Sequence, residues 1–319
     1  MDSRVASWFM SKVMRPLMGG MDRWERHLVA TPGVHRALPD APVRFEIMRE
    51  SMKRGRAQME PEMMGIMPGI LRGMRSSMRT LQSNPDNPSA RVPDGFLNDL
   101  ETYTRSLGVA SVGYTRVPEQ WIFKGKALLH LNAIVLTMEM DKVRIDTAPS
   151  IGCKQAVMEI YRDLGYAAND LAAYVRRHGY SAHAAHPLMG PTLYPPLTQL
   201  AGLGWLSASG LMITPEFGPR VRLAAVVTNI ENLPFSTHND HAWVAGFCDK
   251  CGICIRECPT KAIYEQPIHH ESGRITCVDN DLCFPYFNDH HGCSVCIKVC
   301  PFNDTPYDRI KAAFLKEAK

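Results

Sequence analysis

Long apolar runs are absent from this 319-residue sequence, in which no 18 consecutive residues are apolar. Such a run marks a membrane-spanning helix, so we expect no membrane span. The first residues hold neither a twin-arginine pair nor an apolar signal core, and we expect no export signal. Neither a Walker phosphate-binding sequence nor a CxxCH haem-attachment site occurs. A dinucleotide-binding GxGxxG is incomplete, because Ser207 stands where the third glycine belongs.

Eight of the ten cysteines fall into two runs near the C-terminal end. The first run is Cys248-x2-Cys251-x2-Cys254-x3-Cys258, and the second is Cys283-x9-Cys293-x2-Cys296-x3-Cys300. A proline follows the last cysteine of each run. This spacing is typical of two [4Fe-4S] clusters, in which the cysteine before the proline ligates the other cluster.

The spacing rule predicts two ligand sets. One cluster takes Cys248, Cys251, Cys254 and Cys300, and the other takes Cys258, Cys283, Cys293 and Cys296. Zinc normally uses paired CxxC motifs, and disulfides suit small secreted chains, so both alternatives fit poorly. Cys277 is an alternative ligand to Cys283, and Cys153 reads as a buried thiol.

The rest of the chain divides into an N-terminal extension and an α/β domain. Residues 1–95 form a Met- and Arg-rich helical extension that ends in a Pro-rich linker. Residues 96–245 alternate helix and strand patterns, with a helix over 153–177 and strands over 132–138 and 221–228. Residues 246–306 hold both cysteine runs and form the predicted cluster domain, and residues 307–319 form a C-terminal helix.

The N-terminal extension is basic and rich in methionine. Residues 1–93 carry 15 Lys and Arg against 9 Asp and Glu, and they hold 13 of the 18 methionines. A basic segment suits docking to an acidic partner, although a solvated helical face is the simpler interpretation. Core packing or a homodimer contact would explain the methionines, which recur at helical spacing. These are Met48, Met52, Met59, Met63, Met67, Met74 and Met78, and we expect Gly65, Pro68, Gly69 and Gly73 to break the helix.

The order of motifs resembles the reductive dehalogenase and epoxyqueuosine reductase superfamily. An AGLGW segment at 201–205 precedes ITPEFGPRVRL at 213–223, and the two cysteine runs follow. The resemblance implies an α+β fold, with a nitroreductase-like corrinoid-binding domain followed by a ferredoxin-like domain for two [4Fe-4S] clusters. It also implies a base-off cobalamin that receives single electrons from the clusters and reduces an organic substrate.

The resemblance further implies roles for individual residues. Tyr161 resembles the proton-donating tyrosine, and Arg220 or Arg222 resembles the nearby arginine, which supplies a permanent positive charge. Tyr114, Tyr166 and Tyr194 are competing tyrosines. The cofactor-binding residues that the resemblance implies lie in the AGLGW and ITPEFGPRVRL segments. They are Gly202, Leu203, Gly204, Thr214, Pro215 and Phe217.

Some residues depart from the family pattern and leave alternatives open. A basic residue is usual shortly after the AGLG segment, but residues 206–209 read LSAS and carry no charge. This favours an alternative, a non-catalytic iron–sulfur protein that docks a redox partner; a flavin-dependent reductase is a third. For the enzyme we expect a cytoplasmic protein, a ferredoxin- or flavodoxin-type low-potential donor, and a small organic substrate.

Overall fold

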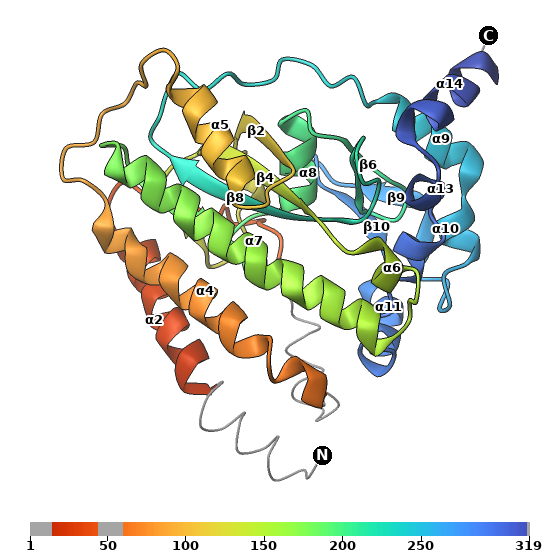
Figure 1. The fold of residues 1–319 in the computed structure, drawn as a ribbon. Coiled ribbons are helices and arrows are strands. Elements are labelled where there is room, and N and C mark those ends of the chain that lie inside the picture. Colours follow the sequence, from red (N-terminus) through yellow and green to blue (C-terminus); the bar gives the residue numbers. More distant parts are fainter. Residues whose placement is uncertain (1–14, 44–59, 318–319) are drawn as a thin grey trace.

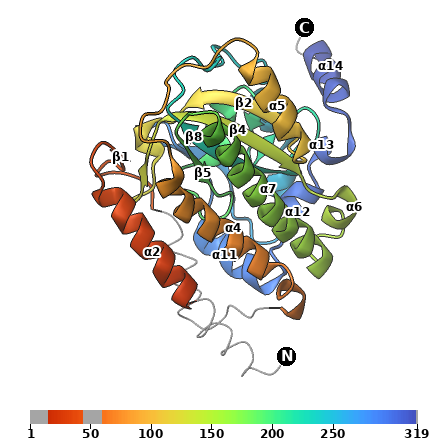
Figure 2. The same ribbon diagram turned by 60° about the vertical axis from the view of Figure 1, so that its left-hand side comes forward.

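The computed structural model describes the backbone of residues 15–43 and 60–317, with side chains from residue 23 onward in the first range. Its centre is a four-stranded antiparallel sheet with the order β2-β4-β8-β5 (Figures 1 and 2). The strands are β2 (Ser111–Arg116), β4 (Asn132–Glu139), β8 (Val221–Thr228) and β5 (Ala182–Ala185). Both faces of this sheet are covered, which explains why β4 and β8 read as nearly continuous apolar runs.

Alternate residues of the strands enter two separate cores. On one face, Ile134 and Leu136 pack against α7 (Ile151–Arg177) and α5 (Phe96–Ser106). On the other face, Ala133 and Val135 pack against α8 (Tyr194–Leu200) and its neighbouring loops. The helices and strands predicted over residues 96–245 are confirmed, with shifts of a few residues at their ends.

The long helix α7 has recognisable start and stop signals. The side chain of Ser150 accepts a hydrogen bond from the backbone N–H of Cys153, at 3.1 Å, and so caps the first turn. Gly179 follows the helix with a φ of 87°, the left-handed conformation that ends many helices. These signals set where α7 begins and ends. The helix lies across the sheet and positions Tyr161.

The N-terminal extension lies beside α7 rather than apart from it. Helix α4 (Met67–Arg79) packs between α2 (Arg15–Ala30) and α7, as Figure 2 shows. Ile70, Leu71 and Met74 are buried in this contact, so this part of the methionine stripe is core packing. The smaller elements nearby are β1 (His35–Arg36), β3 (Ala127–Leu128), η2 (Pro61–Met63), η3 (Thr80–Ser83) and η4 (Glu119–Trp121).

The expectation that Gly69 and Gly73 break the helix is wrong, because α4 runs through both. A Cβ at Gly69 would lie 2.7 Å from Cδ of Arg162, and one at Gly73 would lie 3.0 Å from Nε2 of His186. The glycines therefore allow α4 to approach α7 and β5 closely. Met48, Met52 and Met59 lie outside the described residues.

The cysteine runs lie on short helices that follow the sheet domain. Cys254 is on one of these helices and Cys296 on another, and the two helices pack together. A hairpin of β9 and β10 separates the two runs. The elements are α9 (Trp243–Cys251), α10 (Ile253–Arg256), β9 (Ile263–His269), β10 (Ile275–Val278), α11 (Asn280–Asp289), α12 (Val295–Lys298), α13 (Pro301–Asp304) and α14 (Tyr307–Glu317).

Two short segments of the sheet domain contact this cysteine-rich part. The hairpin of β6 (Trp205–Leu206) and β7 (Met212–Ile213) is one, and α6 (Lys142–Ile145) is the other. The turn after β7 also approaches closely, since a Cβ on Gly218 would lie 2.2 Å from the carbonyl oxygen of Phe302. Among the described residues, no helix has the length and apolar character that crossing a bilayer requires.

Candidate functional site

A first, narrow cavity is lined by one of the two predicted cysteine sets. Cys248, Cys251, Cys254 and Cys300 all line it, although Cys300 is 46 residues or more away from the other three in sequence. Ser207 and Ser209, from the loop between β6 and β7, close the side that faces the sheet domain. The fold thus gathers the four thiols that the spacing rule assigns to one cluster.

A second cavity of about 240 Å³ is lined by the other set. Cys258, Cys283, Cys293 and Cys296 face it, and Cys296 also borders the first cavity. The opposite wall includes Leu211 and Arg222 of the sheet domain. Within residues 15–43 and 60–317, no three His, Cys, Asp or Glu side chains converge as they would on a single metal ion. The thiols instead surround two volumes.

Burial controls the electrostatics of these thiols. It raises the pKa of Cys248 and of Cys296 to about 12 and that of Cys283 to about 11. Cys258 is the exception: burial raises its pKa, but hydrogen bonds from the backbone N–H groups of Ala262 and Thr260 outweigh burial and lower it. Burial disfavours the negatively charged thiolates, and the positive charge of bound iron would stabilise them, because a metal cation deprotonates a coordinating thiol.

The two remaining cysteines occupy different places. Cys277 on β10 is buried, with its sulfur 4.0 Å from the carbonyl oxygen of Ser207, and it lines neither of the two cavities. Cys283 lines the second cavity together with three other cysteines, so its position suits a ligand better. Cys153 is fully buried in α7, and burial raises its pKa.

A third cavity of about 440 Å³ lies between the sheet domain and the cysteine-rich part. Pro196, Gln199 and Leu200 of α8 form one wall, and residues 273–278 of the β9–β10 hairpin form the other. Ser209 lines this cavity and both cysteine cavities. This position, between two domains, is a common one for small-molecule and cofactor sites.

The six expected cofactor-binding residues do not line these three cavities. Leu203 packs against the core between the sheet and α8. The backbone N–H of Gly202 donates a hydrogen bond to the carbonyl of Gln199. A Cβ on Gly204 would lie 2.1 Å from the carbonyl oxygen of Ile213, so this glycine serves the β6–β7 hairpin. Thr214 and Gly218 exchange two backbone hydrogen bonds and form a turn that contains Pro215 and Phe217.

The residues that do line the third cavity come from less distinctive sequence. They include Trp121, Leu206, Ser209 and Gly210. A signal was present, because the loop 207–211 directly follows the glycine-rich segment singled out in the sequence. The remaining wall depends on how α8 and the β9–β10 hairpin meet, and no local pattern specifies that contact.

Tyr161 and Arg222 are brought together by α7 and β8. The guanidinium carbon of Arg222 lies 5.0 Å from the centre of the Tyr161 ring. Arg222 shares a strand face with Ala224 and Val226, which pack against α7, as the two-residue period of a strand requires. Its Nε is buried without a hydrogen-bond partner.

Arg220 lies apart from this pair. Its guanidinium donates to the backbone oxygen and the side-chain oxygen of Asn303, at 3.1 and 3.2 Å, and pairs with Glu139 at 3.2 Å. Asn303 in turn donates its backbone N–H to the carbonyl of Cys300. Arg220 is therefore occupied in holding the Cys300 segment against the sheet. Among the competing tyrosines, Tyr114 bonds to Glu101, and Tyr194 donates to the carbonyl of His186.

Comparison with known proteins agrees with this arrangement. Residues 247–303 match the family model of the 4Fe-4S dicluster domain. The C-terminal part of the chain is thus a dicluster domain, attached to a mixed helix-and-sheet domain.

Curated relatives carry the two names that the motif order suggested. The chain is 36% identical over 181 residues to a tetrachloroethene reductive dehalogenase of Sulfurospirillum multivorans, covering 54% of this chain and 35% of that protein. It is 32% identical over 124 residues to an epoxyqueuosine reductase of Atelocyanobacterium thalassa (isolate ALOHA), covering 36% and 38%. The predicted resemblance to this superfamily is confirmed, and the chain spans little more than a third of the length of either relative.

A solved structure has the same fold. It is a reductive dehalogenase whose structure suggests a mechanism for B12-dependent dehalogenation. The TM-score is 0.65 at 23% identity, with 80% of this chain and 39% of that chain covered. At this identity the likeness establishes the fold alone.

Proposed function

We propose that this chain acts as a corrinoid-dependent reductase of the reductive-dehalogenase type, with two [4Fe-4S] clusters and a base-off cobalamin. The observation that carries this proposal is the position of Ser209, which borders both cysteine cavities and the large cavity between the domains. Clusters held in the first two cavities would lie next to a cofactor held in the third. The B12-dependent relative of the same fold adds support.

The cluster ligands proposed from spacing agree with the cavities. Cys248, Cys251, Cys254 and Cys300 would hold one cluster, and Cys258, Cys283, Cys293 and Cys296 the other. The hairpin loop 206–210, α8 and β10 would hold the corrinoid, in place of the AGLG and ITPEFG residues first expected. The corrinoid, when bound, supplies a low-potential cobalt centre that can deliver electrons to an organic substrate.

The chain itself supplies proton transfer and positive charge. The phenolic O–H of Tyr161 is the proposed proton donor, and the guanidinium beside its ring is the proposed fixed charge that favours a developing anion. Arg222 also lines the second cysteine cavity, which places its charge beside a proposed cluster. Arg220 serves as a positioning residue for Cys300.

Electrons would come from a low-potential donor of the ferredoxin or flavodoxin type, and the substrate would be a small organic molecule. A cytoplasmic location and a homodimer formed through the N-terminal extension stay predictions. The domain boundaries near residues 95, 245 and 306 also stay predictions.

Cobalt binding separates this proposal from its main rival, the non-catalytic electron carrier. The chain is purified without oxygen, its clusters are reconstituted, cob(II)alamin is added, and electron paramagnetic resonance spectra are recorded. A base-off cobalt signal that saturates at one cobalt per chain supports the enzyme. Two intact clusters without any cobalt binding would leave the carrier as the function.

The third cavity can be tested with a matched pair of variants. Leu200 lines this cavity and is 42% exposed, whereas Leu315 on α14 is 44% exposed and lies outside it. Leu200→Trp should weaken corrinoid binding about tenfold or more by filling the cavity, and Leu315→Trp should leave it unchanged. Equal binding by both variants would move the corrinoid away from this cavity.

A further inference from the structure

A surface groove of about 370 Å³ runs between α9 and α14, at the end of the molecule away from α2 (Figure 1). Its lining is mostly apolar and includes Phe247, Ile310 and Phe314. The rings of Phe247 and Phe314 meet edge to face with their centres 6.1 Å apart, a contact that holds the two helices together. The groove is therefore a formed feature of the cysteine-rich part.

The groove shares a wall with the first cysteine cavity. Cys251 and Phe247 line both the groove and that cavity. Cys251 is half-buried, whereas Cys258 of the other cysteine set is buried. A cluster held in the first cavity would lie directly behind this wall. Because electron transfer slows steeply with distance, a donor seated in the groove would be well placed to reduce that cluster.

The second cysteine cavity lies on the inner side of the first. It shares Ser209, Val278 and Asn280 with the cavity proposed for the corrinoid, whereas the first cavity shares only Ser209 among their lining residues. Arg222 of the sheet domain also lines the second cavity. The arrangement sets an order that runs from the groove to the first cluster, then to the second cluster, and then to the corrinoid.

Two exposed cations line the groove. Lys250 is on α9 and Arg309 is on α14, and neither forms an ion pair with another described residue. The Nζ of Lys250 lies 5.1 Å from the centre of the Phe314 ring, a cation–π contact that keeps its charge at the apolar lining. Glu317 also lines the groove, so cations outnumber anions there by one.

Further cations stand beside the loop that carries Cys251. Arg256 is exposed, and its guanidinium donates a hydrogen bond to the carbonyl of Cys251 at 2.9 Å. Lys261 is exposed as well and donates to the carbonyl of Arg256. Asp249 and Glu257 are exposed on the same segment, but neither forms an ion pair with these cations. The cations therefore stay available to an acidic partner.

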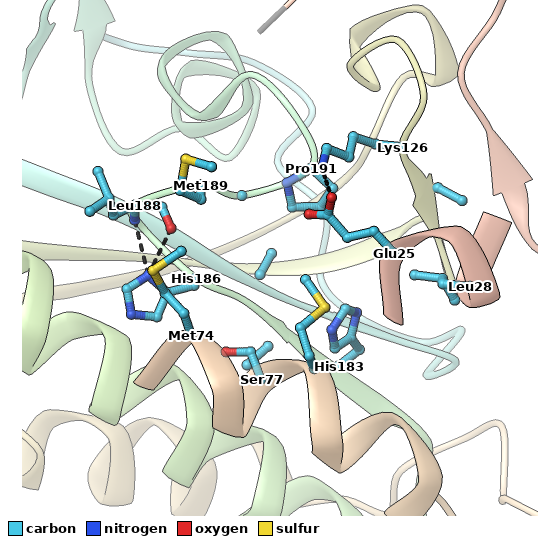
Figure 3. A pocket seen from close by; sticks show the side chains of 15 residues that line it. Glu25, Leu28, Met74, Ser77, Lys126, His183, His186, Leu188, Met189 and Pro191 are labelled. Carbon is cyan, nitrogen blue, oxygen red and sulfur yellow. Dashed lines mark hydrogen bonds and ion pairs between the residues drawn. The ribbon is translucent and has the colours of Figure 1, made fainter. Parts of the chain in front are cut away.

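The cavity between α2, α4 and β5 differs from the groove in size and in charge (Figure 3). It holds about 60 Å³, which is room for water molecules but not for part of another protein. Lys126, the cation among its lining residues, is paired with Glu25, as the dashed line in Figure 3 marks. An acidic partner would therefore find unpaired cations at the groove and not at this cavity.

We propose that the groove is the docking site of the electron donor, and that this donor is a protein with acidic side chains around its redox cofactor. An apolar centre with a charged rim is the usual anatomy of an interface between proteins. Opposite charges steer the partners of such brief complexes and speed their association.

The proposed step moves a single electron. The donor loses one electron, the cluster held by Cys248, Cys251, Cys254 and Cys300 gains it, and no covalent bond forms or breaks. The inference rests on the two clusters of the proposed function and does not depend on its corrinoid.

The test uses the full chain with reconstituted clusters and without cobalamin, so its result is independent of the cobalt measurement. Fully reduced flavodoxin, an acidic electron carrier, is mixed with the chain at low salt, and oxidation of its flavin is followed by stopped-flow absorbance. Photoreduced deazariboflavin is the comparison, because it is small and uncharged and needs no docking site. Clusters that accept electrons from deazariboflavin but not from flavodoxin would overturn the proposal.

Charge reversal locates the docking site. Lys250→Glu combined with Arg309→Glu should slow reduction by flavodoxin about tenfold or more at low salt, because steering by charge is lost. The difference should nearly vanish in ~1 M salt, where charges are screened over ~3 Å. Lys250→Arg combined with Arg309→Lys keeps both charges and should keep the fast rate. Reduction by deazariboflavin should be the same in all these chains, which shows that the clusters are intact.

The matched control is Arg116→Glu combined with Arg177→Glu. Both arginines are exposed on the sheet domain, and they line neither the groove nor the cysteine cavities. This pair changes the net charge of the chain by the same amount as the groove variant and should leave the flavodoxin rate within about twofold. Equal slowing by both pairs would assign the effect to overall charge and would contradict a docking site at the groove.

Removal of one ligand from each cysteine set tests which cluster is reduced first. Cys251→Ala should slow electron uptake from flavodoxin about tenfold or more, whereas Cys283→Ala should leave it within about twofold, because only the first cluster borders the groove. The reverse pattern would place the entry point at the second cluster and end the proposal.

A second copy of this chain is the alternative occupant of the groove. Sedimentation velocity of the unaltered chain and of the Lys250→Glu, Arg309→Glu variant detects such a contact. If the variant dissociates a dimer and flavodoxin reduces both chains at the same rate, then the groove joins copies of the chain and the proposal is wrong.

Discussion

The guanidinium carbon of Arg222 lies 5.0 Å from the centre of the Tyr161 ring, within the range of a cation–π contact. The two residues are 61 positions apart in sequence, and they meet because α7 covers the face of β8 that carries Arg222. Arg222 also lines the cavity that Cys258, Cys283, Cys293 and Cys296 line. This contact connects the proposed proton donor to the proposed electron path.

Removal of the Tyr161 hydroxyl should abolish turnover while the cofactors stay bound. A positioned general acid contributes roughly 10²–10⁴-fold to a rate, so Tyr161→Phe should lose about that factor. Turnover is measured with the best substrate from a panel of organohalides and a low-potential reductant. Cobalt binding is measured in parallel by electron paramagnetic resonance.

Tyr166→Phe is the matched control for this prediction. Tyr166 lies on the same helix but faces α4, where its hydroxyl approaches Gly69. Its loss should leave the rate within about twofold, because a general acid acts only on a group within hydrogen-bond reach. Turnover that survives in Tyr161→Phe would assign the proton to another residue.

Arg222 should require its charge and its flat shape. Arg222→Gln removes the permanent cation beside Tyr161, and Arg222→Lys keeps a charge but not the planar group that stacks on the ring. We expect a strong loss of rate for the glutamine variant and an intermediate loss for the lysine variant. Equal rates in all three proteins would show that Arg222 only fills space.

Serine substitutions should distinguish Cys283 from Cys277. Cys283→Ser should leave a chain with about half the iron, because Cys283 shares its cavity with three other cysteines. Cys277→Ser should retain the full iron content, because Cys277 lines neither cysteine cavity. Iron and sulfide analysis after identical reconstitution gives the answer, and the opposite pattern would reverse the ligand assignment.

The local patterns of the sequence predicted the sheet domain well for a physical reason. β4 and β8 are buried on both faces, so their sequences are nearly all apolar. α7 is long and capped, so its helical spacing and its capping residue can be recognised in the sequence. The gathering of Cys300 with Cys248, Cys251 and Cys254 also followed from spacing alone. That gathering supports the predicted ligand sets.

Contacts between distant segments were harder to predict. Glycines often break helices, but Gly69 and Gly73 lie within α4. Because they have no side chain, α4 can pack closely against α7 and His186. The third cavity likewise depends on the contact between α8 and the β9–β10 hairpin. Its lining therefore includes Leu206 and Ser209, whereas the more distinctive Gly204 and Thr214 shape turns.

Loss of Arg220 should destabilise the junction between the sheet and the cysteine-rich part. Arg220→Ala would leave the buried oxygens of Asn303 without their donor and remove the partner of Glu139, at a cost of ~1–3 kcal/mol. Urea unfolding followed by tryptophan fluorescence measures this cost. Arg116→Ala, at the exposed end of β2, is the control and should change stability little.

Buried His183 should make the protein less stable as the pH falls. Its pKa is lowered to about 4 by burial, whereas an unfolded histidine has a value near 6.5. Below about pH 6.5 the unfolded chain therefore binds a proton that the folded chain rejects until about pH 4. In that window stability falls by up to about 1.4 kcal/mol per pH unit for this group.

His183→Leu should remove this share of the pH dependence. Between pH 7 and pH 5, the urea midpoint of the unaltered protein should fall more steeply than that of the variant, and both proteins carry the same cysteine-rich part. His238→Leu, whose side chain is 75% exposed, should keep the steeper slope. If His183→Leu and the unaltered protein lose stability in parallel, then His183 takes up its proton equally in both states, and the lowered pKa assigned to its buried imidazole would be wrong.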